Sequence, residues 1–119
     1  MDVSIQTAKP DDLAALGQLL RQLFVIEADF NFDSEKVELA LKQLLNDERG
    51  CVLVARSEGD VIGMCTAQRV VSTAEGGYSA WIEDVVVDRS YRGRGIGKQL
   101  LDGIRAWAKE QGIVRLQLL

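Results

Sequence analysis

The sequence contains no histidine among its 119 residues. That absence excludes Ser-His-Asp and Cys-His catalytic sites, and it excludes metal sites that depend on histidine ligands. A general base in this protein must be a carboxylate, a Lys, Tyr or Cys side chain, or a water molecule held by one of them. We expect no metal site.

Cysteine is also scarce, and the two that occur, Cys51 and Cys65, lack the CxxC spacing of zinc and redox sites. Each lies in an apolar, strand-like run, where a free cysteine behaves as a small hydrophobic residue. The sequence therefore predicts that both thiols pack in the core and take no part in chemistry.

Long hydrophobic runs are missing too, since none approaches the roughly 20 residues of a membrane-spanning helix. The N-terminus lacks the basic start and apolar stretch of a signal peptide. The 18 acidic residues outnumber the 14 Lys and Arg, which argues against a nucleic-acid binder and is compatible with a cationic small substrate. These features predict a soluble, cytoplasmic protein without a membrane or nucleic-acid partner.

The hydrophobic patterning that is present predicts one α/β (α+β) domain over residues 1–119. Three middle strands form an antiparallel meander, and the strand–helix–strand segment 78–118 forms a parallel βαβ unit. Asp33 or Ser34 is expected to cap the second helix. The predicted order is β-α-α-β-β-β-α-β, with strands at 3–7, 51–57, 61–71, 78–87 and 113–118 and helices that begin near residues 10, 34 and 96.

The strongest chemical signal is the segment YRGRGIGK, residues 91–98. Its glycines lie between a strand and a helix, where they allow a sharp turn and the close approach of a ligand. The helix that follows points unpaired N–H groups and its positive dipole end at the same place. This arrangement is typical of phosphate binding, and Arg92, Arg94 and Lys98 add positive charge. Tight packing of the turn is the alternative interpretation.

Two common phosphate motifs do not fit this segment. Lys98 stands where G-x-G-x-x-G needs its third glycine, and Gln99 stands where a P-loop needs Ser or Thr. The pattern that fits is [R/Q]-x-x-G-x-[G/A], made by Arg92, Gly95 and Gly97. Placed after a strand that ends in VVVD, it resembles the GNAT family of acetyl-CoA-dependent N-acetyltransferases, and the resemblance covers essentially the whole chain. The strand WIEDVVV also resembles the diamine acetyltransferase branch.

The resemblance implies a GNAT-like mixed sheet and acetyl-CoA as co-substrate. The backbone of residues 85–87 would pair with the pantetheine arm, and the main-chain amides of residues 93–98 would surround the pyrophosphate. An amine would attack the thioester directly in a ternary complex, so no histidine or activated cysteine is needed. The implied acetyl-CoA-binding residues are Val85, Val86, Val87, Arg92, Gly93, Arg94, Gly95, Gly97 and Lys98.

Glu83 is the candidate general base, directly or through a water molecule, because it lies just before the strand end that would pair with pantetheine. The alternative is an ion-paired or solvent-facing glutamate. Asp84 is expected to point to the opposite face and to be structural if the strand is regular. A bulge at this point would blur that assignment.

The amine acceptor is expected to be a small, cationic molecule. Glu27, Asp29 and Asp33 lie in the loop between the first two helices, where this family often forms its acceptor site. A solvated acidic loop is the alternative interpretation. Trp81 could line the acceptor pocket, but a strand tryptophan is more often a core residue.

The chain stops at Leu119, whereas the family domain usually continues with another helix and two strands. The final strand, residues 113–118, is then expected to have an open edge and uncovered apolar side chains. Three explanations compete: a longer natural protein, a homodimer in which a partner covers the site, and a reduced, inactive acetyl-CoA binder. A non-catalytic acetyl-CoA sensor and an interaction protein that uses its open edge are therefore alternatives to an enzyme.

Overall fold

The computed structural model describes residues 2–26 and 32–119. Within them, one mixed sheet has the strand order β1-β2-β3-β4-β5. Neighbouring strands are antiparallel from β1 to β4, whereas β4 and β5 are parallel. The strands are β1 (Ser4–Thr7), β2 (Gly50–Ser57), β3 (Asp60–Ser72), β4 (Gly77–Val87) and β5 (Ile113–Leu118). The predicted fold class, element order, meander and βαβ unit are confirmed.

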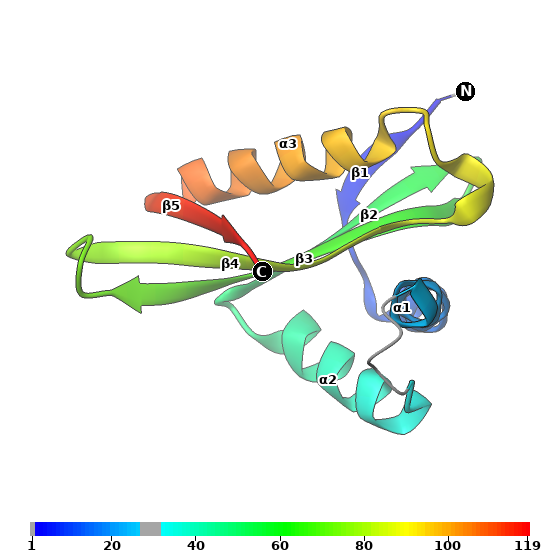
Figure 1. Ribbon diagram of the computed structural model, residues 1–119, viewed down its shortest axis with the longest axis horizontal. Helices are drawn as coiled ribbons and strands as arrows, with labels where there is room; N and C mark the ends of the chain where they lie inside the picture. Colours follow the sequence, from blue (N-terminus) through cyan, green and yellow to red (C-terminus); the bar gives the residue numbers. More distant parts are fainter. Residues whose placement is uncertain (1, 27–31) are drawn as a thin grey trace.

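The α-helices of the described residues cover both faces of the sheet (Figure 1). Helix α3 (Ile96–Glu110) packs on one face, whereas α1 (Leu13–Ile26) and α2 (Ser34–Asn46) pack on the other. Asp33 caps α2, because its carboxylate accepts hydrogen bonds from the N–H groups of Glu35 and Lys36. Short 3₁₀ turns precede α1 (η1, Pro10–Asp12) and lie between β4 and α3 (η2, Arg89–Tyr91).

Each face of the sheet has its own hydrophobic cluster. The α3 face contains Ile82, Leu100 and Ile104, and the α1–α2 face contains Leu16, Met64 and Val86. Both cysteines are buried on the α3 face, and burial raises the pKa of each thiol to about 12. The prediction of core packing for the two cysteines is confirmed.

The two halves of β4 have different surroundings. The first half is paired with β3 on one edge and β5 on the other. The second half has buried or half-buried valines on both faces of the sheet. At the sheet margin, β5 carries exposed apolar side chains on Val114 and Leu118, as expected. In the described part of the chain, no helix is long and apolar enough to cross a membrane.

Candidate active site

Strands β4 and β5 part halfway along β4. Their parallel pairing runs from Tyr78 to Ile82, and the N–H of Leu119 donates to the Ile82 carbonyl at 2.9 Å. Beyond Ile82, the described residues offer β4 no partner on this side, although β4 continues to Val87. The second half of β4 therefore presents a main-chain edge that a ligand can reach.

The direction of hydrogen bonds identifies which groups face that edge. Asp88 donates its N–H to the carbonyl of Ile62 across β3, at 2.8 Å. Because successive strand residues direct their main-chain groups to alternate edges, Val87 and Val85 face the open edge and Val86 faces β3. The Val87 carbonyl indeed accepts a hydrogen bond from Nε of Arg92 at 2.9 Å. Of the three valines predicted to pair with the pantetheine arm, Val85 and Val87 have main-chain groups that face the open edge, whereas those of Val86 face β3.

The turn that follows leads directly into α3. Gly93 and Gly95 both have φ of 78°, a left-handed conformation that favours glycine. A Cβ added to either would meet no atom within 4 Å, so the space above the turn is open. The N–H groups of the first helical turn have no intrahelical acceptor. This combination fits an anionic group such as a pyrophosphate.

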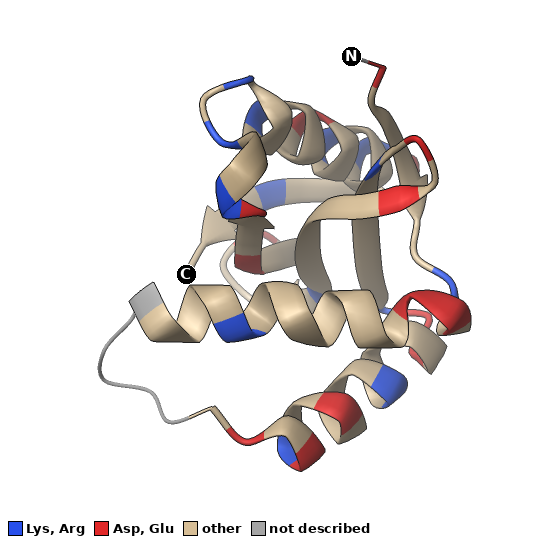
Figure 2. Ribbon diagram, turned by 90° about the vertical axis from the view of Figure 1, so that its right-hand side faces the viewer, with Lys and Arg blue, Asp and Glu red and all other residues tan. Residues whose placement is uncertain are grey.

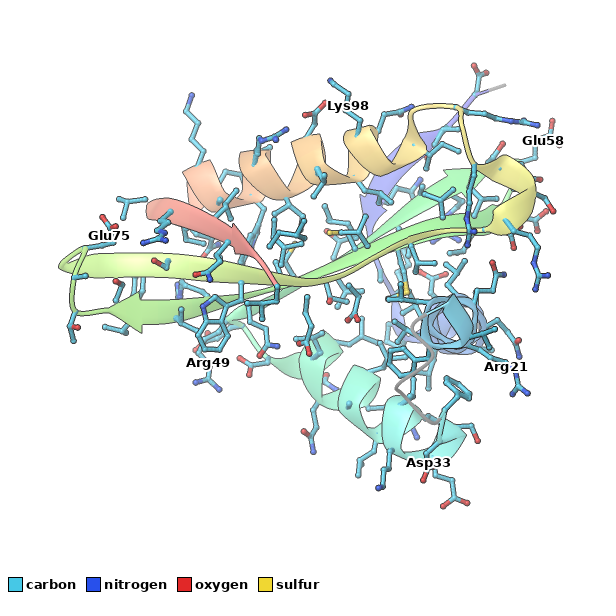
Figure 3. The ribbon with its side chains drawn as sticks, in the orientation of Figure 1. Arg21, Asp33, Arg49, Glu58, Glu75 and Lys98 are labelled. Atoms are coloured by element: carbon cyan, nitrogen blue, oxygen red, sulfur yellow. The ribbon has the colours of Figure 1, made fainter. Side chains whose placement is uncertain are left out.

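The basic side chains of the turn are engaged to different degrees; Figure 2 marks the Lys and Arg positions of the ribbon in blue, including those in the turn that leads into α3. Arg94 lies over the Tyr91 ring, 5.4 Å from its centroid. Lys98 projects away from the sheet and bonds to Asp102 at 3.2 Å (Figure 3). Arg92 is the one that the structure ties to the open edge of β4. The basic side chains therefore surround the main-chain N–H groups of the glycine turn.

A bulge interrupts β4 at Glu83. Thr66 of β3 pairs with Asp84, but the next residue, Ala67, pairs with Ile82, so Glu83 is an extra residue. The bulge switches the alternation of side chains, because Ile82 lies in the α3-face cluster whereas Val86 lies in the α1–α2-face cluster. In a regular strand these two residues would share a face.

The bulge places both Glu83 and Asp84 in one hollow of about 310 Å³ on the α1–α2 face. The expectation that Asp84 points to the opposite face is therefore wrong, and the irregular backbone is the reason. Glu83 is exposed and is 3.4 Å from Nε2 of Gln68. Asp84 is half-buried and accepts a hydrogen bond from the Thr66 hydroxyl at 2.7 Å.

The other walls of the hollow come from helices α1 and α2. Leu20, Phe24, Val37, Ala40, Leu41 and Leu44 form an apolar surface opposite the carboxylates. Asp47, at the C-terminal end of α2, adds a third carboxylate, and hydrogen bonds from Arg49 hold its pKa below the usual value. The described lining residues include no Lys or Arg. The lining of the hollow therefore combines carboxylates with a largely apolar helix surface.

The remaining predicted acceptor residues have different outcomes. Trp81 is 44% exposed, so it is not a core residue, and it does not line the hollow but pairs across the sheet with Gln68, which does. Asp33 serves as the cap of α2. Glu27 and Asp29 lie outside the described residues. Among those described, no group of His, Cys, Asp or Glu side chains is arranged to hold a metal ion.

The contribution of α2 to this hollow was not predicted from the sequence. Ala40 is exposed and lines the hollow, and Leu44, which also lines it, is only half-buried. The signal that could have indicated a cavity is that Gln43 and Asp47 each follow a residue of the apolar stripe of α2 by three positions and so lie on the same side of the helix, where a fully core-facing stripe would be apolar.

Comparison with known proteins identifies the relatives of this architecture. The model of the "Acetyltransferase (GNAT) family" matches residues 16–119. The N-alpha-acetyltransferase 80 of Mus musculus is 40% identical over 58 residues, which represent 49% of this chain and 18% of that protein. The aminoglycoside N(6')-acetyltransferase type 1 of Stenotrophomonas maltophilia is 27% identical over 113 residues, 92% of this chain and 69% of that protein.

A solved structure gives the same picture in three dimensions. A protein from Clostridium difficile 630, described as a "possible acetyltransferase", superimposes with a TM-score of 0.88 at 27% identity. The match covers 98% of this chain and 78% of that one. The matched family model includes α2, the whole sheet from β2 onward, the glycine turn and α3. The chain therefore belongs to the GNAT family of acetyl-CoA-dependent N-acetyltransferases.

Proposed function

We propose that this chain transfers the acetyl group of acetyl-CoA to the primary amine of a small cation bound in the acidic hollow. One observation carries the proposal: Glu83 lies between Ile82, where β4 leaves β5, and Val85, the first valine of the open edge. The acidic group and the open main-chain edge therefore meet at one point of the sheet. This is where a thioester and an amine could react.

The donor side would be held mainly by main-chain groups. Val85 and Val87 would pair with the amides of the pantetheine arm as an added strand does. The N–H groups of residues 93–98 would surround the pyrophosphate, with Arg92, Arg94 and Lys98 supplying positive charge. Arg92 would also fix the end of β4 through its bond to Val87.

The acceptor side favours an amine with an apolar portion. The carboxylates of Glu83 and Asp84 would attract an ammonium group, and the apolar wall of α1 and α2 would cover a hydrocarbon part. A carboxylate on the acceptor would be repelled, because no lining cation compensates it. The name of the Stenotrophomonas maltophilia relative points to aminoglycosides. Diamines fit the same chemistry.

The reaction needs proton removal before attack. An alkylammonium with a pKa near 10 is almost wholly protonated at neutral pH. Glu83 would accept one proton from it, directly or through a water molecule, and the amine nitrogen would then attack the thioester carbonyl. The C–S bond breaks as the amide forms. The second proton lost by the nitrogen balances the thiolate, which leaves as the free CoA thiol.

Two measurements test the proposal together. Millimolar acetyl-CoA should raise the melting temperature, because a ligand that binds only the folded state stabilises it. CoA thiol release should then be measured with alkylamines, diamines, an aminoglycoside and an amino acid at equal concentration. We expect release with the cationic amines and little with the amino acid. No stabilisation by acetyl-CoA, or stabilisation without release for any amine, would contradict the proposal.

A further inference from the structure

A buried side chain of the neighbouring strand, Thr66, is hydrogen-bonded to the residue that follows the bulge at Glu83. Thr66 is 1% exposed and lies directly opposite Asp84. Its hydroxyl oxygen accepts a hydrogen bond from the Asp84 N–H at 3.2 Å and donates one to Oδ2 of Asp84 at 2.7 Å. One hydroxyl therefore binds both the main chain and the side chain of the residue that follows the bulge.

This pair of bonds lies where the strand changes its alternation. From Asp84 onward, β4 follows the phase that turns the N–H of Asp88 toward Ile62 and the main chain of Val85 and Val87 to the open edge. Before the bulge, the opposite phase places Ile82 on the α3 face. A shift of one residue would reverse every orientation beyond the bulge. The register at Asp84 thus decides both where Glu83 points and which valines face outward.

We propose that Thr66 is a positioning residue for the transfer reaction: its hydroxyl fixes the bulge, so that Glu83 faces the acceptor hollow while Val85 and Val87 face the donor edge. The inference rests on the proposed function. Thr66 itself touches neither substrate. It acts through Asp84, to which its hydroxyl is bonded twice.

The chemistry of the position explains why a hydroxyl is needed there. Valine has nearly the shape of threonine but neither donates nor accepts, so it would leave a half-buried carboxylate and an N–H without this partner. Serine keeps the hydroxyl and loses only a methyl group. The pair Thr66→Val and Thr66→Ser therefore separates the hydrogen bonds from the packing.

The first test is kinetic and uses the whole chain. Thr66→Val should lower kcat by about tenfold or more, since small misplacements of reacting groups have large effects on rate. The KM for acetyl-CoA should also rise, because the open edge is affected. Thr66→Ser should restore both parameters to within about threefold of the starting protein. Ser79→Ala removes another buried hydroxyl from β4, before the bulge, and should leave both parameters unchanged.

A second measurement does not depend on activity. The Asp84 amide should exchange with solvent faster in Thr66→Val than in the starting protein or Thr66→Ser, because it loses its hydrogen bond to the Thr66 hydroxyl. Equal exchange in all three proteins, or normal kcat in a folded Thr66→Val variant, would overturn the inference. If the starting protein releases no CoA with any amine but the exchange difference is found, the proposed function fails while the role of Thr66 in the bulge stands.

Discussion

The two halves of the candidate site are built in opposite ways. The proposed donor half, from Val85 to Lys98, is one continuous stretch in which main-chain amides and carbonyls would do most of the binding. The acceptor half consists of side chains from α1, α2, β3 and β4, brought together only by the fold. A continuous main-chain site depends on backbone conformation, whereas a dispersed side-chain site depends on packing and register. The same kind of substitution should therefore affect the two halves differently.

The largest effect should come from the acceptor half, at Glu83. Glu83→Gln keeps the size of the side chain but removes its ability to accept a proton. We expect kcat at neutral pH to fall by about 100-fold, within the usual contribution of a general base. The stabilisation by acetyl-CoA should not change, because the donor half is intact.

The matched control for this change is Glu75→Gln. Glu75 lies between β3 and β4, far along the strand from the bulge, and its carboxylate is 3.9 Å from Arg115. Steady-state rates of CoA release should be the same for this variant and the starting protein. An equal loss in both variants would show that the effect is one of net charge, and unchanged turnover in Glu83→Gln would remove Glu83 from the mechanism.

The donor half should respond to backbone strain instead. Gly95→Ala forces a Cβ into a left-handed conformation with φ of 78°, which costs about 1–2 kcal/mol. Either the protein loses that stability or the turn relaxes, and in both cases the amides around the pyrophosphate move. We expect acetyl-CoA to bind about tenfold more weakly by calorimetry, while kcat at saturating acetyl-CoA changes little.

A second glycine with a left-handed conformation, Gly112, provides the matched control for Gly95→Ala. Gly112, just after α3, has φ of 69° and is remote from the glycine turn. Gly112→Ala should lower the stability by a similar amount without weakening acetyl-CoA binding. If both variants lost affinity equally, binding would depend on the general stability of the domain and not on the geometry of the turn.

The smallest effect is expected where the two halves are joined. The carboxylate of Asp88 accepts hydrogen bonds from the Ser90 N–H at 2.9 Å and from Nε2 of Gln22 in α1 at 3.1 Å. These bonds hold the pKa of Asp88 below its usual value of 3.8. The stabilisation is therefore present above pH 4 and is lost as the pH falls through the lowered pKa of the folded state.

Asp88→Asn should remove this pH-dependent contribution. We expect the variant to be less stable than the starting protein at pH 7 by about 1 kcal/mol or less. The difference in melting temperature should shrink as the pH is lowered from 5 to 2. A difference that stays constant over this range would mean that the charge of Asp88 is not what links the turn to α1.

The same contrast explains what the sequence could predict. Strand β5 and the start of α2 follow from local patterns: apolar and polar residues alternate from Val114 to Leu118, and Asp33 has the side chain that a helix N-terminus needs. The glycine turn is likewise local. The bulge at Glu83 is not, because it depends on which residue of β3 lies opposite and on the hydroxyl of Thr66. A prediction based on regular alternation of side chains therefore could not locate the extra residue at Glu83.

The acceptor hollow escaped prediction for a related reason. An apolar stripe on α2 is compatible with either a filled core or a cavity wall, and only the spacing between α2 and the sheet separates the two. Trp81 differs from the prediction in the opposite sense. Its size favoured a core position, but it lies in β4 before the bulge and is 44% exposed.

The two buried cysteines have a consequence for the chemistry around this protein. A thiol with a pKa of about 12 is almost wholly protonated at physiological pH, and burial also denies it contact with reagents. In the folded domain, Cys51 and Cys65 are therefore poorly suited to take the acyl group from a thioester or to form a mixed disulfide with free CoA. In an assay of the proposed reaction with folded protein, the CoA thiol that is released would therefore be distinguishable from the protein's own buried thiols.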